Sequence, residues 1–170
     1  MEIQCTKSLL RPWRIDDALS LCKYANNSKV SENLRDIFPF PYTQVDAEFF
    51  IKNIASATNN LILAIEVDGA AVGSIGIMPQ TDVYRKNAEL GYWLGEQYWG
   101  RGIVTEAVNA VVDHTFKNLT ITRIYASVFE RNIASIRVLE KCGFEKEAIH
   151  YKAVVKNNVV MDEYRYVKLK

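Results

Sequence analysis

Hydrophobic and polar residues alternate in short runs along the chain, a pattern that predicts β-strands. The clearest pair, Leu61–Val67 and residues 70–78, is joined by Asp68-Gly69, which tolerates the positive φ angles of a tight turn and so predicts a hairpin. A second turn is predicted at Lys156-Asn157-Asn158, because asparagine accepts a left-handed backbone. The remaining predicted strands are residues 7–11, edge-like and closed by Pro12, Asn87–Leu94, Arg123–Phe129, residues 149–155 and residues 159–167.

Segments in which apolar residues recur every three or four positions predict four helices. The fourth helix is expected to end at Gly143, a residue suited to the position just after a helix. Residues 30–41 are irregular and aromatic, which predicts a loop packed against the rest of the protein. The predicted N-terminal ends of the four helices are Asp16 or Asp17, a position near Thr43, Gly102 and Asn132.

The order of these elements predicts a single domain over residues 1–170 of the α+β class. Hairpins give a mostly antiparallel sheet, and the strand-helix-strand order in the middle requires at least one parallel crossing. A chain of 170 residues can enclose one core without disulfides or a structural metal. Neither an internal repeat nor a linker interrupts the pattern.

Composition narrows the classes of partner. Apolar residues make up 49% of the chain and charged residues 24%, and we find no apolar run long enough to cross a bilayer. The first residues lack the pattern of a signal peptide, so a cytoplasmic location and free thiols at Cys5, Cys22 and Cys142 are expected. The spacing of the cysteines predicts no metal site. A net charge of +1 indicates neither a nucleic acid nor a membrane partner.

The loop Gln97-Tyr98-Trp99-Gly100-Arg101-Gly102 lies between a predicted strand and a predicted helix. Its glycines allow a ligand to approach the backbone closely, and the start of the helix offers N–H donors to an anion such as a pyrophosphate. A tight turn into a helix would explain the glycines equally well. Ile103 stands where a phosphate-binding loop needs lysine, and Thr105 stands where the dinucleotide fingerprint needs glycine. The loop therefore belongs to neither of these nucleotide-binding classes.

The same six residues match the Gln/Arg-x-x-Gly-x-Gly/Ala signature of the GNAT acetyltransferases. Other segments resemble the RimJ/RimL-like branch, whose members include ribosomal-protein N-acetyltransferases, so the resemblance covers nearly the whole chain. It implies the GNAT fold: a mixed, mostly antiparallel seven-stranded sheet with splayed central strands, flanked by helices. The segments that carry the branch resemblance are residues 9–12, 88–94, 105–107, 132–135 and 139–144, together with Asp162.

The resemblance implies that acetyl-CoA is the co-substrate and assigns a binding role to each part of the loop region. Backbone amides of residues 97–102 would hold the pyrophosphate, and the strand ending at Leu94 would pair with the pantetheine arm. No metal is implied. The residues implied to bind acetyl-CoA are Tyr92, Trp93, Leu94, Gln97, Tyr98, Trp99, Gly100, Arg101, Gly102, Ile103, Asn132 and Ser135.

Two residues are catalytic candidates by the same resemblance, and each has a structural alternative. Ser135 would act near the thioester, or it is simply a small polar residue in a helix; Glu89 would receive the proton of the amine, or it faces solvent. Asn132 would bond the pantetheine arm, or it only caps its helix. Leu139 occupies the position where many GNAT enzymes carry the tyrosine that protonates the leaving thiolate. Ser135, a water, or unassisted release of a thiolate whose pKa is about 8.5 remain as explanations.

The branch implies that the acceptor is the N-terminal α-amine of a protein or peptide. An α-amine, of pKa about 7.8, is neutral at pH 7 far more often than a lysine or polyamine nitrogen of pKa about 10.4. Polyamines and aminoglycosides remain alternatives, and the leucine at position 139 leaves open a CoA-binding sensor without activity. Residues 30–42 and the hairpin near Asn157 are expected to wall the acceptor site, and relatives that form dimers imply a homodimer.

Overall fold

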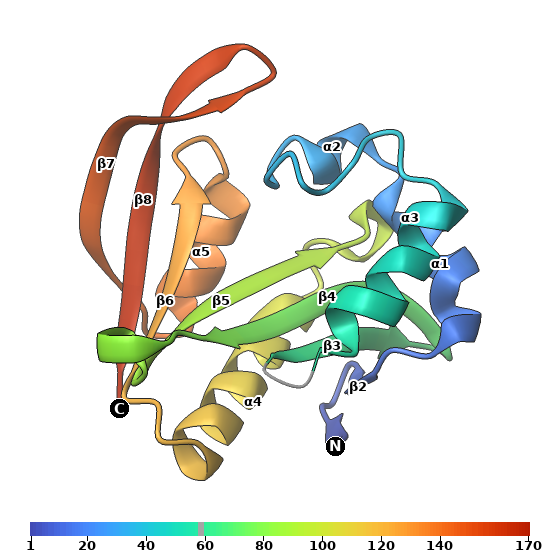
Figure 1. Ribbon diagram of the computed structural model, residues 1–170, viewed down its shortest axis with the longest axis horizontal. Helices are drawn as coiled ribbons and strands as arrows, with labels where there is room; N and C mark the ends of the chain where they lie inside the picture. Colours follow the sequence, from blue (N-terminus) through green and yellow to red (C-terminus); the bar gives the residue numbers. More distant parts are fainter. Residues whose placement is uncertain (58–59) are drawn as a thin grey trace.

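The computed structural model describes residues 1–57 and 60–170. Its described residues form one mixed sheet of eight strands in the order β1-β2-β3-β4-β5-β6-β8-β7 (Figure 1). Each neighbouring pair is antiparallel except β5 and β6, which run parallel. The strands are β1 (Ile3–Gln4), β2 (Leu9–Pro12), β3 (Leu61–Val67), β4 (Ala70–Pro79), β5 (Asn87–Leu94), β6 (Arg123–Phe129), β7 (Glu145–Lys156) and β8 (Val159–Leu169).

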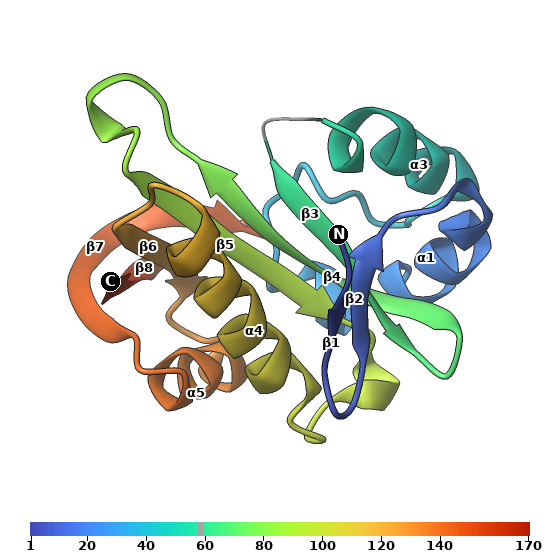
Figure 2. The same cartoon turned by 90° about the horizontal axis from the view of Figure 1, so that it is seen from below.

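Helices cover both faces of this sheet. Helices α4 and α5 pack on one face, and α1 and α3 lie on the other (Figures 1 and 2). Within the described residues, none of the helices is long and apolar enough to cross a membrane. The helical segments are η1 (Ile15–Asp17), α1 (Ala18–Ala25), α2 (Ser28–Ser31), α3 (Gln44–Phe49), the π-helical η2 (Phe50–Ala55), η3 (Asp82–Tyr84), η4 (Glu96–Tyr98), α4 (Ile103–Asn118) and α5 (Ile133–Lys141).

The core has two parts, one on each face. The larger part joins the sheet to α4 and α5 through fully buried side chains such as Ile75, Ile77, Val108 and Val111. Each such side chain contributes roughly 1.5–3 kcal/mol by leaving water. The smaller part packs α1 against α3 and η2 beneath Tyr42. The sheet is thus held from both sides, which fixes the strand ends that surround the cavity described below.

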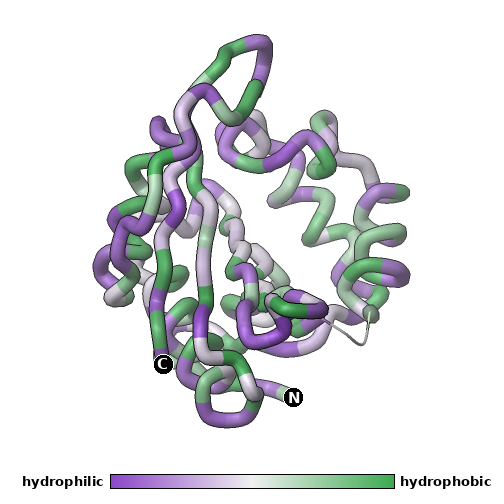
Figure 3. The backbone as a smooth tube through the Cα atoms, turned by 60° about the vertical axis from the view of Figure 1, so that its left-hand side comes forward, coloured by the Kyte–Doolittle hydropathy of each residue, from purple (hydrophilic) through white to green (hydrophobic). Residues whose placement is uncertain are grey.

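Several predicted turns are confirmed by backbone angles. Asp68 and Gly69 have φ of 50° and 79°, as a hairpin turn between β3 and β4 requires. Asn157 and Asn158 have φ of 51° and 61° and join β7 to β8. Gly143 ends α5 with φ of 76°. Figure 3 shows the β7–β8 hairpin projecting beyond the rest of the chain.

The predicted strand count of seven is wrong, because the described residues also form β1. This two-residue strand pairs with Leu9 and Leu10, a contact too short to leave a periodic signal in the sequence. The strand predicted over residues 7–11 begins instead at Leu9 and includes Pro12. Proline is tolerated there because β1 begins at Ile3, opposite Leu10, so β1 does not pair with β2 at Pro12.

The predicted helix cap at Asp16 or Asp17 is confirmed in position, at Asp17, but its contacts differ from those of a usual cap. Asp17 occupies the N-cap position of α1 but makes no side-chain cap bond. Its carboxylate instead accepts hydrogen bonds from Arg11 at 2.7 and 2.8 Å and from the backbone N–H of Arg14 at 2.8 Å. A buried guanidinium competes for this carboxylate more strongly than a helix N–H does. The predicted loop over residues 30–41 is interrupted only at its start, by the last residues of α2.

The two central strands diverge, as the resemblance implied. Strands β5 and β6 pair only at their beginnings, where the last register pair is Glu89 with Tyr125. Beyond it, β5 stays with β4 as far as Leu94, and β6 stays with β8 as far as Phe129. The sheet therefore opens into a wedge between the second halves of β5 and β6.

Candidate active site

A cavity of about 680 Å³ occupies this wedge. Its lining includes Gly76 and Gly91, which are register partners on β4 and β5. In the described residues no strand pairs with the β6-facing edge of β5 beyond Glu89, so the main-chain groups there are available to a ligand. The walls are residues 90–94 of β5, residues 126–129 of β6, Asn132 and Ser135 of α5, residues 98–105 in part, and parts of residues 29–42.

The glycine loop lies between β5 and the first turn of α4, as predicted. Gly100 and Gly102 have φ of 74° and 76°, angles that most residues other than glycine avoid. A Cβ added at Gly100 would meet no atom within 4 Å, so the loop faces open space. Gly102 is the N-cap of α4, a helix of sixteen residues whose first N–H groups and dipole favour an anion. The loop geometry therefore fits a pyrophosphate.

Side chains around the loop reinforce it. Lys7 donates a hydrogen bond of 2.9 Å to the backbone oxygen of Arg101, and the Arg101 guanidinium lies 5.3 Å from the centre of the Tyr98 ring. The indole N–H of Trp99 donates to the backbone oxygen of Leu94 at 2.7 Å, which ties the loop to the end of β5. Tyr98, Trp99, Gly100, Gly102 and Ile103 line the cavity, whereas Gln97 and Arg101 are exposed and do not line its described part.

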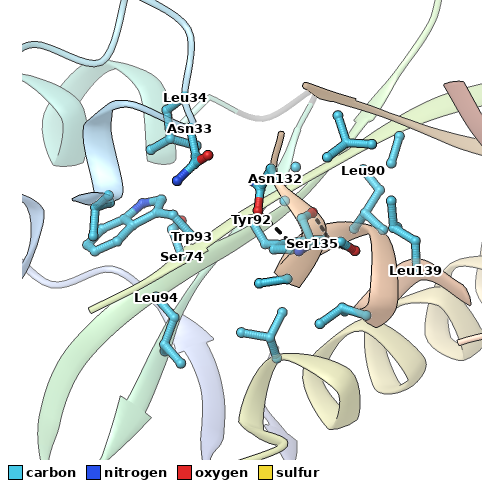
Figure 4. Close-up of a pocket in the computed structure, with 18 of the residues that line it drawn as sticks. Asn33, Leu34, Ser74, Leu90, Tyr92, Trp93, Leu94, Asn132, Ser135 and Leu139 are labelled. Carbon is cyan, nitrogen blue, oxygen red and sulfur yellow. Dashed lines mark hydrogen bonds between the residues drawn. The ribbon is translucent and has the colours of Figure 1, made fainter. Parts of the chain in front are cut away.

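The predicted residues Asn132 and Ser135 lie beside Tyr92 in the opened part of the wedge (Figure 4). The side-chain oxygen of Asn132 accepts a hydrogen bond of 3.1 Å from the Ser135 N–H, so it caps α5. Its amide nitrogen is the group that a ligand could use. The Tyr92 hydroxyl oxygen lies 2.8 Å from the Ser135 hydroxyl oxygen and 3.3 Å from the Ser135 backbone oxygen.

Burial raises the pKa of the Tyr92 hydroxyl, and the hydrogen bond with Ser135 offsets this only in part. The phenol therefore stays protonated well above neutral pH. Because side chains alternate along β5, the neighbouring Trp93 points to the opposite face, where its ring packs edge-on against Phe38 at 5.6 Å. Leu139 lies one turn after Ser135 and is buried, with 1% of its surface exposed. Its position offers no proton donor, as the sequence indicated.

Glu89 lies where β5 and β6 begin to diverge and forms an ion pair with Arg35. It does not simply face solvent, since 18% of its side chain is exposed. Burial, followed by the negative charge of Glu89, raises the pKa of Tyr125 across the strand pair. Sequence reasoning missed Arg35 because its partner is 54 positions away and no periodicity joins them.

Residues of segment 27–36 line the cavity, and the segment bonds to four other parts of the chain. Besides the Arg35–Glu89 pair, Lys29 pairs with Glu96 in the loop after β5. Arg131 donates to the backbone oxygen of Glu32 at 2.7 Å, and Lys156 of β7 donates to Asp36 at 2.7 Å. A smaller cavity of about 250 Å³ lies between this segment and β7, and shares Arg35, Phe129 and Glu163 with the main one.

Comparison with known proteins assigns the family. The sequence profile of the Acetyltransferase (GNAT) domain matches residues 7–145. With this match, the wedge and the glycine loop, the chain belongs to the GNAT acetyltransferases, enzymes that transfer an acetyl group.

Related sequences carry the same activity in their names. The N-acetyltransferase p20 of Bacillus licheniformis, uncharacterized by its description, is 29% identical over 100% of this chain and 97% of its own. YjcK of Bacillus subtilis is 42% identical over 56% of this chain, and the match spans about half of that protein, 52%. The spermine/spermidine N(1)-acetyltransferase of Bacillus subtilis is 30% identical over 49% of this chain and 57% of its own.

Solved structures share the fold over nearly the full chain. A GNAT-family acetyltransferase from Bacillus anthracis superposes with a TM-score of 0.86 at 25% identity, covering 99% of this chain and 98% of that one. The microcin C7 self-immunity acetyltransferase MccE, in complex with acetyl-CoA and AMP, gives 0.85 at 26% identity over 97% and 93%. The ribosomal L7/L12 alpha-N-protein acetyltransferase RimL, in complex with coenzyme A, gives 0.88 at 20% identity over 99% and 98%, and its likeness shows the fold alone.

The two roles of Asn132 can be separated by substitution. Asn132→Asp keeps the oxygen that caps α5, so its free energy of unfolding should stay within about 0.5 kcal/mol of wild type, whereas Asn132→Ala should lose about 1 kcal/mol. Both lack the amide nitrogen, and both should bind CoA about tenfold more weakly by isothermal titration calorimetry. Wild-type CoA affinity in a folded Asn132→Asp variant would leave capping as the only role of this residue.

Proposed function

We propose that this enzyme transfers the acetyl group of acetyl-CoA to the N-terminal α-amine of a protein or peptide, as the RimJ/RimL-like branch does. The observation that carries this proposal is the charge of the main cavity. Among the described residues, its lining has two acidic side chains, Glu89 and Glu163, and four basic ones: Lys29, Arg35, Arg137 and Lys141. Such a lining suits a donor with several phosphates and an acceptor with one amine. It lacks the acidic excess that would attract a polycation.

Both acids in the lining already have basic neighbours. Glu89 is paired with Arg35, and Glu163 lies 3.3 Å from the His150 ring nitrogen and 4.0 Å from Arg165. Neither carboxylate is free to bind a second ammonium group of a polyamine without displacing its partner. An α-amine has no second charge to satisfy, and it is neutral in a useful fraction near pH 7 because its pKa is about 7.8.

The proposed roles of the residues follow from their positions. Backbone amides of residues 97–102 and of the first turn of α4 hold the pyrophosphate of acetyl-CoA, and the open edge of β5 with Asn132 holds the pantetheine arm. Backbone N–H groups near Leu94 stabilise the oxyanion that develops on the acetyl carbonyl. Glu89 receives the amine proton directly or through water, and Ser135 contacts the sulfur. Segment 27–36 and β7 border the acceptor entrance.

Two other functions remain as rivals. The relative named spermine/spermidine N(1)-acetyltransferase makes a polyamine an alternative acceptor, and aminoglycosides present similar clustered amines. A CoA-binding sensor without catalysis is the rival from another class, since Leu139 replaces a common acid. Neither rival explains why Glu89 is neutralised by Arg35.

Acceptor profiling with a matched variant tests the proposal. The wild-type protein is incubated with acetyl-CoA and N-terminal peptides, spermidine or an aminoglycoside, and released CoA is followed with a thiol reagent. Peptides with a free α-amine should have the highest kcat/KM. In Arg35→Gln the ratio of spermidine to peptide kcat/KM should rise about tenfold, because an unpaired carboxylate attracts a nearby cation by roughly 1–4 kcal/mol.

The control is Lys52→Gln, which breaks the exposed pair between Lys52 of η2 and Glu48 of α3 and should leave the ratio unchanged. A wild-type preference for spermidine over every peptide would overturn the proposed acceptor. Tight CoA binding without release of CoA in the presence of any amine would establish the sensor instead.

A further inference from the structure

The hydroxyl groups of Tyr92 and Ser135 form an isolated pair inside the cavity. They come from different elements, β5 and α5, and their oxygens lie 2.8 Å apart (Figure 4). Position 139, one turn further along α5, is a buried leucine. A phenol is therefore present beside the helix, but a strand supplies it instead of the helix position where the family resemblance places a tyrosine.

The direction of this hydrogen bond can be argued from the groups around it. The phenol has one proton, and two Ser135 oxygens lie within its reach, the hydroxyl at 2.8 Å and the backbone oxygen at 3.3 Å. The backbone oxygen belongs to the helix ladder, which supplies a donor from one turn later. Either hydroxyl could be the donor in the shorter contact, and because the backbone oxygen already has its helix partner, we assign the phenol as the donor there. This leaves the proton of the Ser135 hydroxyl free to point into the cavity.

The environment keeps the phenol in its donor form. Burial raises the pKa of Tyr92, so the hydroxyl does not ionise in the pH range where the enzyme can be studied. A hydroxyl that accepts one hydrogen bond becomes a stronger donor of its own proton. Tyr92 thus has both the position and the protonation state to polarise Ser135.

We propose that Tyr92 is a positioning residue that directs the Ser135 hydroxyl toward the sulfur of the CoA moiety. The inference rests on the proposed acetyl transfer. In that reaction the amine nitrogen bonds to the acetyl carbon, the carbon–sulfur bond breaks, and its electron pair stays on sulfur as a thiolate. The amine proton passes to Glu89 or solvent. Ser135 donates a hydrogen bond to the thiolate without giving up its proton, since a thiol of pKa about 8.5 is a far stronger acid than a serine hydroxyl.

A binding experiment tests this without turnover. The affinities of CoA and of desulfo-CoA, which has no thiol, are measured by calorimetry between pH 7 and about pH 9.5. In the wild-type protein the ratio of CoA affinity to desulfo-CoA affinity should grow with pH, because Ser135 stabilises the thiolate. Ser135→Ala should reduce this affinity ratio about tenfold. Tyr92→Phe, which keeps the ring, should remove most of the preference for CoA.

The double variant shows whether Tyr92 acts through Ser135. Tyr92→Phe should lower kcat about tenfold in the wild-type background and have little further effect in Ser135→Ala. The control is Tyr166→Phe, which removes another phenol hydroxyl; Tyr166 is buried, and its hydroxyl donates to Glu140 at 3.0 Å. That variant should change stability without changing the ratio of CoA to desulfo-CoA affinity.

The positioning role would be overturned if the losses of kcat from Tyr92→Phe and Ser135→Ala were additive. It would also be overturned if both folded variants kept the wild-type ratio of CoA to desulfo-CoA affinity. Thermal unfolding confirms that each variant is folded before it is compared. If no peptide is acetylated but the ratio changes as expected, the acceptor is wrong and the Tyr92–Ser135 pair still contacts the sulfur. The two failures are therefore distinguishable.

Discussion

Gly102→Val should weaken CoA binding by about a hundredfold or more. Gly102 has φ of 76° at the N-cap of α4, and a β-branched residue avoids this backbone region strongly. The new Cβ would also lie 2.9 Å from the Lys7 ammonium nitrogen, so that side chain must shift. Relaxing the strain turns the N–H groups of the loop away from the anion. Losing two hydrogen bonds to a charged phosphate costs roughly 1.5–3 kcal/mol each.

The measurement is isothermal titration calorimetry with CoA, and the chain offers a matched control. Gly69 has φ of 79° in the β3–β4 turn, and a Cβ there would meet no atom within 4 Å. Gly69→Val therefore introduces the same backbone strain away from the cavity, and it should lower stability while leaving CoA affinity unchanged. If folded Gly102→Val binds CoA like wild type, backbone amides at this loop do not hold the pyrophosphate.

Arg11→Ala should lower the free energy of unfolding by about 3–5 kcal/mol. The Arg11 side chain is 2% exposed, and it bonds the two carboxylates of Asp17 and Glu66. Removing it leaves two poorly solvated negative charges facing each other without a cation. The loss is measured as a shift in urea unfolding. Arg14→Ala is the control, because the Arg14 side chain is 62% exposed and lies 3.7 Å from Glu2, so its loss should cost no more than about 1 kcal/mol.

The acid stability of the fold should change with the same substitution. Burial raises the pKa of Asp17, but hydrogen bonds from Arg11 and the Arg14 backbone outweigh it and hold that pKa below its ordinary value. A depressed folded-state pKa stabilises the protein above the unfolded pKa of about 3.9, and this contribution is lost as pH falls through the folded value. The free energy of unfolding of the wild-type protein should fall in that acidic window, and that of Arg11→Ala should fall less steeply there. Equal acid sensitivity in the two proteins would contradict the ion pair.

Much of the fold could be predicted because its signals are local. The bounds of β5 and β6 agree with the predicted runs residue for residue, and Asp68-Gly69 and Gly143 have the backbone angles that their residue types favour. Asn132 caps α5 as its position indicated. Each of these features depends on neighbouring residues alone, so alternation and turn chemistry were sufficient.

The misplaced features involve partners that are distant in the sequence. Asp17 occupies the predicted cap position, but the sequence does not show that its carboxylate bonds the buried Arg11. β1 was missed because two residues carry no periodic signal. The Arg35–Glu89 pair joins residues 54 positions apart, and Tyr92 meets Ser135 across 43 positions. Only a formed sheet decides which of these charged or polar groups meet.

The loop of residues 97–102 shows which features the sequence determines and which features depend on the tertiary structure. The sequence by itself determined its glycines, its place between a strand and a helix, and its match to the GNAT signature, because these are properties of adjacent residues. Only the tertiary structure decided that the loop opens onto a wedge between β5 and β6, with Tyr92 and Ser135 facing each other inside it. That arrangement arises because β5 follows β4 while β6 follows β8, and pairing between strands is a long-range property of the whole sheet.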